Sequence, residues 1–432
     1  MTPAARLAAA IDVIADIEAR RRPAPDALKD WGLAHRFAGS GDRAGIAGLV
    51  YDALRRKASA AWIMDEATPR AVMLGMLRLE RGLDPAAIAR LADGGRYSAA
   101  ALSAAEQATL TSSSLDDAPA HVAGDYPEWL DLPLARVFGD DRVAEGAALA
   151  HRAPLDLRVN TLKADRDKVF SELAHHAPAR TRWSPLGLRI AVAADAKSPP
   201  IQAEPAFLKG HVEVQDEGSQ LAALLSGANP GEQVIDLCAG AGGKTLALAA
   251  MMENHGQIFA TDLDLRRIAP IHARLQRAGV RNVQVRTPRR DEDVLADLAG
   301  RADLVLIDAP CTGTGSWRRN PDAKWRVRPG ALAARVKEQA DLLDRAVALL
   351  KPAGRIAYVT CSVLAEENGD KVQAFLARHP EYCAAPPAEF TAVLGESAAA
   401  FRQAALTSPE GLLMTPRRTA TDGFFLALLR RR

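Results

Sequence analysis

The feature that most constrains the fold is an alternation of short apolar runs with helical stretches, which starts near "GHVEVQDEGSQLAALL" and continues towards the C-terminus. Each run is short enough for a buried strand and is followed by apolar residues at helical spacing. The runs expected to be strands are 233–237, 257–261, 283–285, 304–307 and 355–360. Strands that alternate with helices pair in parallel, so the sequence predicts a doubly wound α/β sheet.

The 432 residues exceed what one hydrophobic core organises, and the pattern changes along the chain. The first part is rich in alanine and arginine and has helical spacing throughout, which predicts an all-α domain over 1–135. "LDLRVNTLKADRDKV" and "TRWSPLGLRIAV" combine short strands with a helix start, so a small α/β module is expected over 145–205. The doubly wound domain is then expected over 206–432.

Composition argues against several classes of protein. No apolar run approaches the length of a membrane span, and the N-terminal segment lacks the apolar block of a signal peptide, so a cytoplasmic protein without membrane contact is expected. The four cysteines form no C-x-x-C pair, which disfavours a zinc framework or a disulfide scaffold. His175 and His176 are adjacent but have no further ligand at metal-binding spacing, so we expect surface residues and no metal site.

A glycine cluster, "DLCAGAGGKT", follows the first strand of the doubly wound pattern. A phosphate-binding P-loop requires glycine where the chain has Cys238, and a dinucleotide fingerprint requires glycine where it has Thr245. An S-adenosylmethionine loop tolerates this shorter cluster and expects an acid at the end of the next strand, where Asp262 lies. Such an acid also suits a nicotinamide ribose, and an isolated cluster is often only a tight turn. Its position favours a ligand, without deciding which one.

Two cysteines end strands of the predicted sheet: Cys311 in "DAPCTGTG" and Cys361 in "YVTCSV". The carboxyl ends of neighbouring parallel strands face one crevice, so both thiols are expected beside the bound cofactor. A thiolate is the form that attacks carbon. With Asp308 as an acid, the set predicts covalent activation of carbon 5 of a pyrimidine by thiolate addition at carbon 6.

A basic segment with tryptophans, "SWRRNPDAKWRVRPG", follows Cys311. Cations for phosphates and aromatic faces for unstacked bases are typical of single-stranded RNA recognition. A solvated basic loop is the commoner origin of such a run, and the net charge of +2 gives no general nucleic-acid signal. Its position next to the predicted site favours RNA.

Together, "DLCAGAGGKT", "DAPCTGTG", "RRNPDAKW", "TCSVLAEEN", "VQDEGSQ" and "DGFFLALL" resemble the RNA (cytosine-5) methyltransferase family of the RsmB/Fmu (Sun) type, over about 145–432. "GDRAGIAGLVYDALRRK" is similar to the NusB-like helical RNA-binding domain of that subfamily. The resemblance implies a class I methyltransferase (Rossmann-like) domain that uses S-adenosyl-L-methionine. It also implies an RNA substrate, ribosomal RNA of the small subunit in the first place, and we expect a monomer.

The resemblance also implies roles for individual residues. Cys361 corresponds to the nucleophile, Cys311 to the cysteine that assists breakdown of the adduct, and Asp308 to the acid that contacts the cytosine; the residues alone do not rank the two cysteines. The expected cofactor site comprises Cys238, Ala239, Gly240, Ala241, Gly242, Gly243, Lys244, Asp262, Asp291 and Asp308. The expected RNA contacts are Asn160, Lys163, Arg318, Arg319 and Lys324.

Two departures from the family pattern stand out. Gly240 and Ala241 replace the Ala-Pro that usually precedes the glycine pair, and Asp291, the candidate acid near the adenine, lies two residues later than usual. The sequence therefore predicts an RNA cytosine-5 methyltransferase. The alternatives are a catalytically silent RNA-binding or ribosome assembly factor, a methyltransferase of another RNA such as tRNA, and, more remotely, a P-loop nucleotidase.

Overall fold

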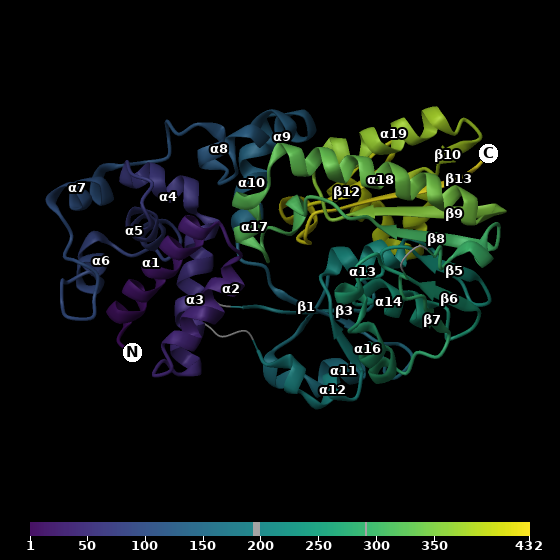
Figure 1. The fold of residues 1–432 in the computed structure, drawn as a ribbon, viewed down its shortest axis with the longest axis horizontal. Coiled ribbons are helices and arrows are strands. Elements are labelled where there is room, and N and C mark those ends of the chain that lie inside the picture. The colour runs from purple at the N-terminus through teal and green to yellow at the C-terminus, as the bar shows by residue number, and fades with distance from the viewer. Residues whose placement is uncertain (193–198, 290–291) are drawn as a thin grey trace. The chain divides into compact units, whose positions relative to one another are not determined.

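The computed structural model describes residues 1–192, 199–289 and 292–432, and their contacts divide into two compact units (Figure 1). The first unit contains Met1–Ala153 and Trp317–Arg328, and the second contains the other described residues. The segment Trp317–Arg328 is therefore grouped with the helical residues, although both of its sequence neighbours belong to the second unit. The boundary expected between 205 and 206 falls inside the second unit.

The first unit is helical, as its sequence pattern predicts. Thr2 and Thr68 cap two of its helices with their hydroxyls, and proline follows each cap, which is favourable at the first helical position. Its core is formed by aliphatic side chains of α1, α3, α4 and α5. The helices are α1 (Pro3–Arg20), α2 (Ala24–Ala34), α3 (Ser40–Arg55), α4 (Lys57–Met64), α5 (Pro69–Leu79), α6 (Pro85–Leu91), α7 (Ala104–Ser112), α8 (Ala120–Ala123), α9 (Asp131–Phe138), α10 (Arg142–Ala150) and α17 (Pro321–Arg326).

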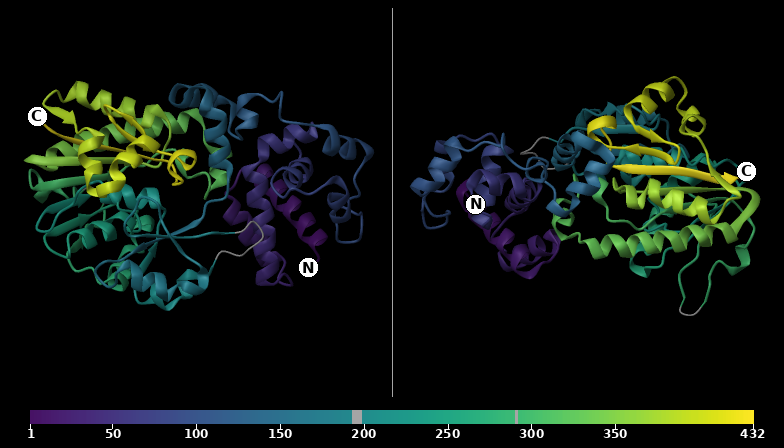
Figure 2. Two further views of the ribbon diagram at one scale, coloured as in Figure 1. Left: turned by 180° about the vertical axis from the view of Figure 1, so that it is seen from behind. Right: turned by 90° about the horizontal axis from the view of Figure 1, so that it is seen from above.

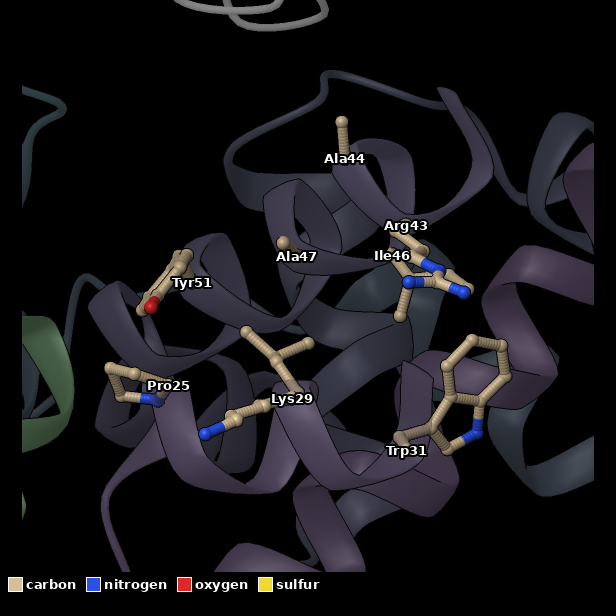
Figure 3. Close-up of a pocket in the computed structure, with 9 residues that line it drawn as sticks. Pro25, Lys29, Trp31, Arg43, Ala44, Ile46, Ala47 and Tyr51 are labelled. Atoms are coloured by element: carbon tan, nitrogen blue, oxygen red, sulfur yellow. The ribbon is translucent and has the colours of Figure 1, made fainter. Parts of the chain in front are cut away.

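A hollow of about 410 Å³ lies between α2 and α3 of this unit (Figure 3). Its lining is mainly apolar, with Trp31 and Tyr51 among the contributors and the cations of Lys29 and Arg43 beside them. None of the residues that the sequence analysis assigns to a site lines it. Among the described residues, no helix is both long enough and apolar enough to cross a membrane.

The second unit contains a small antiparallel sheet with strand order β2-β3-β1-β4. A separate apolar cluster under this sheet includes Leu157, Val159 and Val212. The elements are β1 (Leu155–Val159), β2 (Ala179–Arg180), β3 (Gly187–Ile190), β4 (Val212–Val214), α11 (Arg166–Glu172) and α12 (Pro205–Leu208).

The large sheet of the second unit has nine strands, in the order β11-β12-β13-β9-β8-β5-β6-β7, with β10 paired to β13. The five predicted strands are confirmed as β5 (Gln233–Asp236), β6 (Gln257–Ala260), β7 (Val283–Val285), β8 (Ala302–Asp308) and β9 (Leu350–Thr360), all parallel to their neighbours in this set. The other strands are β10 (Tyr382–Ala384), β11 (Leu406–Ser408), β12 (Gly411–Met414) and β13 (Phe424–Arg431). Strand β13, yellow in Figure 2, runs antiparallel to β9.

Helices cover this sheet because its central strands are apolar on both faces. Val234, Leu304 and Ala357 belong to one core cluster with residues of α13 and α14, whereas α18 contacts β8 and β9 (Figure 1). The helices of this part are α13 (Glu217–Leu224), α14 (Gly243–Met251), α15 (Leu265–Ile268), α16 (Ile271–Ala278), α18 (Pro329–Leu349), α19 (Gly369–Arg378), α20 (Pro387–Phe390), α21 (Ala398–Ala404) and α22 (Pro416–Thr419). The doubly wound architecture is confirmed, and its carboxyl edge gathers the loops described next.

Candidate active site

The two cysteines that end predicted strands meet at the carboxyl edge of the large sheet. Cys311 follows β8 and Cys361 follows β9, and their Sγ atoms are 3.3 Å apart. The hydrogen bond to Cys361, together with burial and the negative charge of a Cys361 thiolate, raises the pKa of Cys311 well above its ordinary value. Cys311 therefore keeps its proton and donates it to Cys361 Sγ when the latter is a thiolate.

The loop after Cys311 is joined to Cys361 and to the start of β13 through glycine backbone. Gly315 N donates to Cys361 O at 2.9 Å, and Gly423 N donates to Gly315 O at 2.8 Å. A Cβ on Gly315 would lie 2.1 Å from Gly423 O, so no other residue fits there. The two motifs "TGTG" and "DGFF" thus share one structural requirement, the close approach of two backbones.

An ion pair joins the end of β8 to the glycine loop. Lys244 Nζ lies 2.7 Å from Asp308 Oδ2, and the same ammonium lies 5.1 Å from the centroid of the Phe424 ring. Lys244 is buried, whereas about a third of the Asp308 side chain (34%) is exposed. Asp308 therefore has one oxygen held by a cation while the side chain keeps access to a ligand.

The glycine loop connects β5 to α14. Gly240 and Gly242 have φ values of 49° and 84°, in the left-handed region that favours glycine. Asp262, after β6, is buried; its Oδ2 accepts from Gly240 N at 3.0 Å and its Oδ1 from Asp264 N at 2.9 Å. An added Cβ on Gly240 would be in ordinary van der Waals contact, 3.6 Å from Arg267 Nη2 and 3.8 Å from Asp262 Oδ2, so the positive φ alone favours glycine there. The loop therefore has a fixed carboxylate acceptor beside its backbone.

Other members of the expected cofactor set contribute backbone or lie elsewhere. Ala239 N donates to Thr261 O at 2.9 Å, which fixes the loop beside β6. Burial raises the pKa of Cys238 well above its ordinary value, so this thiol stays protonated and unreactive. Asp291 lies outside the described residues.

Two arginines clamp the glycine loop from outside, and sequence reasoning missed both. Arg158 Nη1 donates to Gly243 O at 2.8 Å, and Arg274 Nη1 donates to Ala241 O at 2.8 Å. Glu213 pairs with Arg274 at 2.9 Å and lies close enough to Arg158 to favour its charge. Burial lowers the pKa of Arg158 to about 10. In "LRV" alternation places Arg158 on the face opposite to Leu157 and Val159, and nothing in the local sequence shows that this face is covered by the glycine loop.

Asp236 is a second residue that the sequence analysis did not single out. It ends β5 and is buried, and burial raises its pKa to about 7, with the nearby Asp308 charge adding to the shift. Thr245 Oγ1 donates to Asp236 Oδ2 at 2.7 Å. This bond joins the end of β5 to the first turn of α14, so Asp236 holds together the two elements that the glycine loop connects.

The expected RNA contacts in the small sheet region have protein partners. Asn160 is buried, and its Nδ2 donates to Gly210 O at 2.9 Å and to Ala278 O at 2.8 Å. Lys163 Nζ donates to Lys209 O at 3.0 Å and to Arg277 O at 2.6 Å. Both side chains therefore join the small sheet to α16, and a role in RNA binding stays a prediction.

The expected RNA contacts in the basic segment lie within the helical unit. Lys324 and Arg318 are buried; Lys324 Nζ donates to Arg55 O at 3.0 Å, and Arg318 O accepts from Arg55 Nη2 at 3.0 Å. Burial lowers the pKa of Lys324 to about 7. Arg319 is half-buried, and the exposed cations of the segment are Arg326 and Arg328. The RNA role of this segment stays a prediction, and its cations differ strongly in access to solvent.

The histidine pair has a carboxylate neighbour that sequence spacing did not reveal. His175 Nε2 and His176 Nε2 lie 3.2 Å and 2.8 Å from Glu204 Oε1. The three groups are close enough together to hold a metal ion, although these hydrogen bonds already account for their arrangement.

Comparison with known proteins gives consistent results. Residues 223–430 match the family model described as 16S rRNA methyltransferase RsmB/F. A probable ribosomal RNA small subunit methyltransferase B of Synechocystis sp. is 31% identical over 310 residues, which cover 71% of this chain and 67% of the relative. The ribosomal RNA small subunit methyltransferase B of Sodalis glossinidius is 35% identical over 303 residues, 70% of this chain and 65% of that relative. The matches thus span about two thirds of these relatives.

A solved structure agrees with the fold along the whole chain. The crystal structure of PH0851 superposes with a TM-score of 0.71 at 24% identity and covers 100% of this chain and 99% of the other. At this identity the likeness concerns the fold alone.

Proposed function

The chain belongs to the family of RsmB/F-type 16S rRNA methyltransferases, and from that premise we propose that it methylates carbon 5 of a cytosine in small-subunit ribosomal RNA. The observation that carries the proposal is the contact of the Cys311 and Cys361 Sγ atoms at 3.3 Å. Two thiols in contact at the ends of neighbouring strands suit a reaction that forms and then breaks a covalent bond to the base.

The glycine loop fits S-adenosylmethionine, whose sulfonium supplies the methyl group when it is bound. Asp262 offers a carboxylate that backbone N–H groups hold in place, as the two ribose hydroxyls require. The loop lacks the glycine that a P-loop needs at Cys238, so it suits an adenosine with a methionine group better than a pyrophosphate. The Lys244 ammonium contacts both Asp308 and the Phe424 ring, so these three side chains lie together.

The first chemical step belongs to Cys361. Its thiolate adds to carbon 6 of the cytosine, which makes carbon 5 electron-rich and able to accept the methyl group. Asp308, which keeps part of its side chain exposed, contacts the base at ring nitrogen 3 and stabilises the adduct. The Lys244 ammonium at 2.7 Å fixes the direction of the carboxyl group. Cys311 meanwhile stays protonated and stabilises the attacking thiolate through its S–H donor.

The same contact gives Cys311 a second role later in the reaction. Once Cys361 is a thioether it carries no negative charge, so the hydrogen bond to its thiolate and the repulsion by its charge no longer raise the pKa of Cys311, and only burial and the more distant Glu367 charge still do. Cys311 can then release its proton to water and accept the proton from carbon 5, while the electron pair of the carbon 5–hydrogen bond forms the ring double bond and Cys361 leaves as a thiolate. The products are methylated cytosine, S-adenosylhomocysteine, the Cys361 thiolate and protonated Cys311, and the proton released to water balances the positive charge of the sulfonium.

The experiment is a reaction of the purified full-length protein with small-subunit ribosomal RNA from cells that lack it, using S-adenosylmethionine with a labelled methyl group. We expect label in 5-methylcytidine after digestion to nucleosides, identified by mass spectrometry. Label in tRNA alone would show that the substrate is tRNA and would overturn the assignment to ribosomal RNA. Cofactor-independent RNA binding with no label in any RNA would favour the silent assembly factor.

A further inference from the structure

We propose that Glu367 and Asn368 are positioning residues that act on different steps, Glu367 by holding the loop of Cys311 and Asn368 by holding the loop of Cys361. The inference rests on the proposed function and goes beyond it, because it assigns the positioning of each catalytic cysteine to one of two adjacent residues. Neither residue needs to touch the substrate.

Glu367 holds Thr312, the residue after Cys311, directly and holds Pro310, the residue before it, through Gln339. Its side chain is fully buried, Oε1 accepts from Thr312 N at 2.8 Å, and Oε2 accepts from Thr312 Oγ1 at 2.5 Å. Gln339 Nε2, from α18, donates to Glu367 Oε1 at 3.1 Å and to Pro310 O at 3.0 Å. Residue 312 is thus bound to the carboxylate directly and residue 310 through Gln339, and Cys311 lies between them.

Asn368 does the same for Cys361. Its Oδ1 accepts from Thr360 Oγ1 at 2.6 Å, and its Nδ2 donates to Ser362 O at 2.9 Å. Asn368 is also buried, so these bonds have little competition from water. Residues 360 and 362 are thus tied to one amide, and Cys361 lies between them.

The two clamps share one anchor because they are consecutive in the chain. Tyr358 OH, within β9, donates to Glu367 O at 2.7 Å, and α19 begins directly after Asn368, at Gly369. Adjacent residues of one short backbone segment therefore hold both loops, and so set the distance between the two Sγ atoms. The Glu367 charge contributes, after the Cys361 contact and burial, to the raised pKa of Cys311.

The two clamps predict opposite defects. Glu367→Gln keeps the shape of the side chain, but its amide nitrogen cannot accept from Thr312. Cys311 then loses its position relative to carbon 5, so release should be impaired although the charge that helps to raise the pKa of Cys311 is gone. Asn368→Ala frees the backbone on both sides of the nucleophile, so attack should be impaired. The bonds to Glu367 are charge-assisted and those of Asn368 are neutral, and the loss of either set corresponds to a change of about tenfold in the affected step.

The experiment measures two quantities for each variant, with Glu366→Gln as the matched control. The first is single-turnover methylation, and the second is the fraction of protein in an RNA adduct that survives denaturing gels. We expect Glu367→Gln to accumulate the adduct about tenfold while single-turnover methylation is largely kept. Asn368→Ala should lose methylation and adduct together. Equal losses of both quantities in both variants, or wild-type values in both, would overturn the division.

A further readout separates this inference from the proposed function. Diamide takes two electrons and two protons from a thiol pair, and the 3.3 Å contact should let Cys311 and Cys361 form a disulfide quickly, detectable by peptide mapping. Both clamp variants should slow this cross-link relative to Glu366→Gln, and unchanged rates would overturn the positioning role. If wild-type protein shows neither methylation nor adduct, the proposed function fails while the cross-link still tests the clamps.

A milder variant is available if Glu367→Gln does not fold. Thr312→Val removes the hydroxyl bond to Oε2 and keeps the backbone bond to Oε1. It should accumulate adduct in the same direction and to a smaller extent, with the thermal unfolding midpoint measured alongside. A folded Thr312→Val protein without any rise in adduct would refute the role of Glu367 in release.

Discussion

Gly242 is the glycine of the glycine loop, between β5 and α14, that least tolerates a side chain. Its φ of 84° is unfavourable for any other residue, at a cost of about 1–2 kcal/mol. An added Cβ would also lie 2.6 Å from Ile271 Cγ1 and 3.0 Å from Cδ1. Ile271 is fully buried at the start of α16, so the clash costs a further amount of about 1–3 kcal/mol. We therefore expect Gly242→Ala to lower the free energy of unfolding by about 2–5 kcal/mol.

Gly243→Ala provides the matched control, because the nearest atom to its added Cβ is 3.9 Å away and the residue begins α14. Its stability should stay within about 1 kcal/mol of wild type, since alanine favours a helix. Urea denaturation measures both variants, and calorimetry with S-adenosylmethionine should show weaker binding to Gly242→Ala than to wild type. A Gly242→Ala protein as stable as Gly243→Ala would refute this description of the loop.

Two further predictions concern buried charges. Burial depresses the pKa of Lys324 to about 7, so the unfolded chain binds more protons above that pH and stability rises from pH 7 towards 10. Lys324→Met should remove a contribution of about 3 kcal/mol to the change in unfolding free energy between pH 7 and 9.5, and an unchanged pH dependence would contradict the burial of Lys324. Asp236 has its pKa raised to about 7, so its contribution is present at low pH and is lost between pH 4 and 7. Asp236→Asn should therefore gain about 3 kcal/mol relative to wild type between pH 5 and 8 in denaturant titrations, and no relative gain would contradict the assignment.

The sequence predicted the features that depend on local pattern. Apolar runs gave the five parallel strands, and because β8 and β9 are neighbours, the ends of their sequence runs also predicted that Cys311 and Cys361 share one edge. The assignment of the nucleophile to Cys361 and of the releasing role to Cys311 came only from family resemblance, since both thiols end equivalent strands.

The features that sequence reasoning missed depend on contacts between distant segments. Arg158 reaches Gly243 across 85 positions, and nothing local to either residue reveals the bond. The segment with Lys324 has the composition of a solvated basic loop, yet packing within the helical unit buries its ammonium. Composition shows which charged groups a segment contains, whereas their burial depends on the distant residues against which the segment packs.

The central claim is covalent catalysis by Cys361 with release aided by Cys311, and a denaturing gel of two variants tests it most directly. Each variant is incubated with small-subunit ribosomal RNA and S-adenosylmethionine, and protein linked to RNA is quantified by mass spectrometry of the cross-linked peptide. Cys311→Ala should accumulate an adduct through Cys361, whereas Cys361→Ala should form neither adduct nor 5-methylcytidine. Methylation that survives Cys361→Ala, or an adduct that maps to Cys311, would contradict the mechanism.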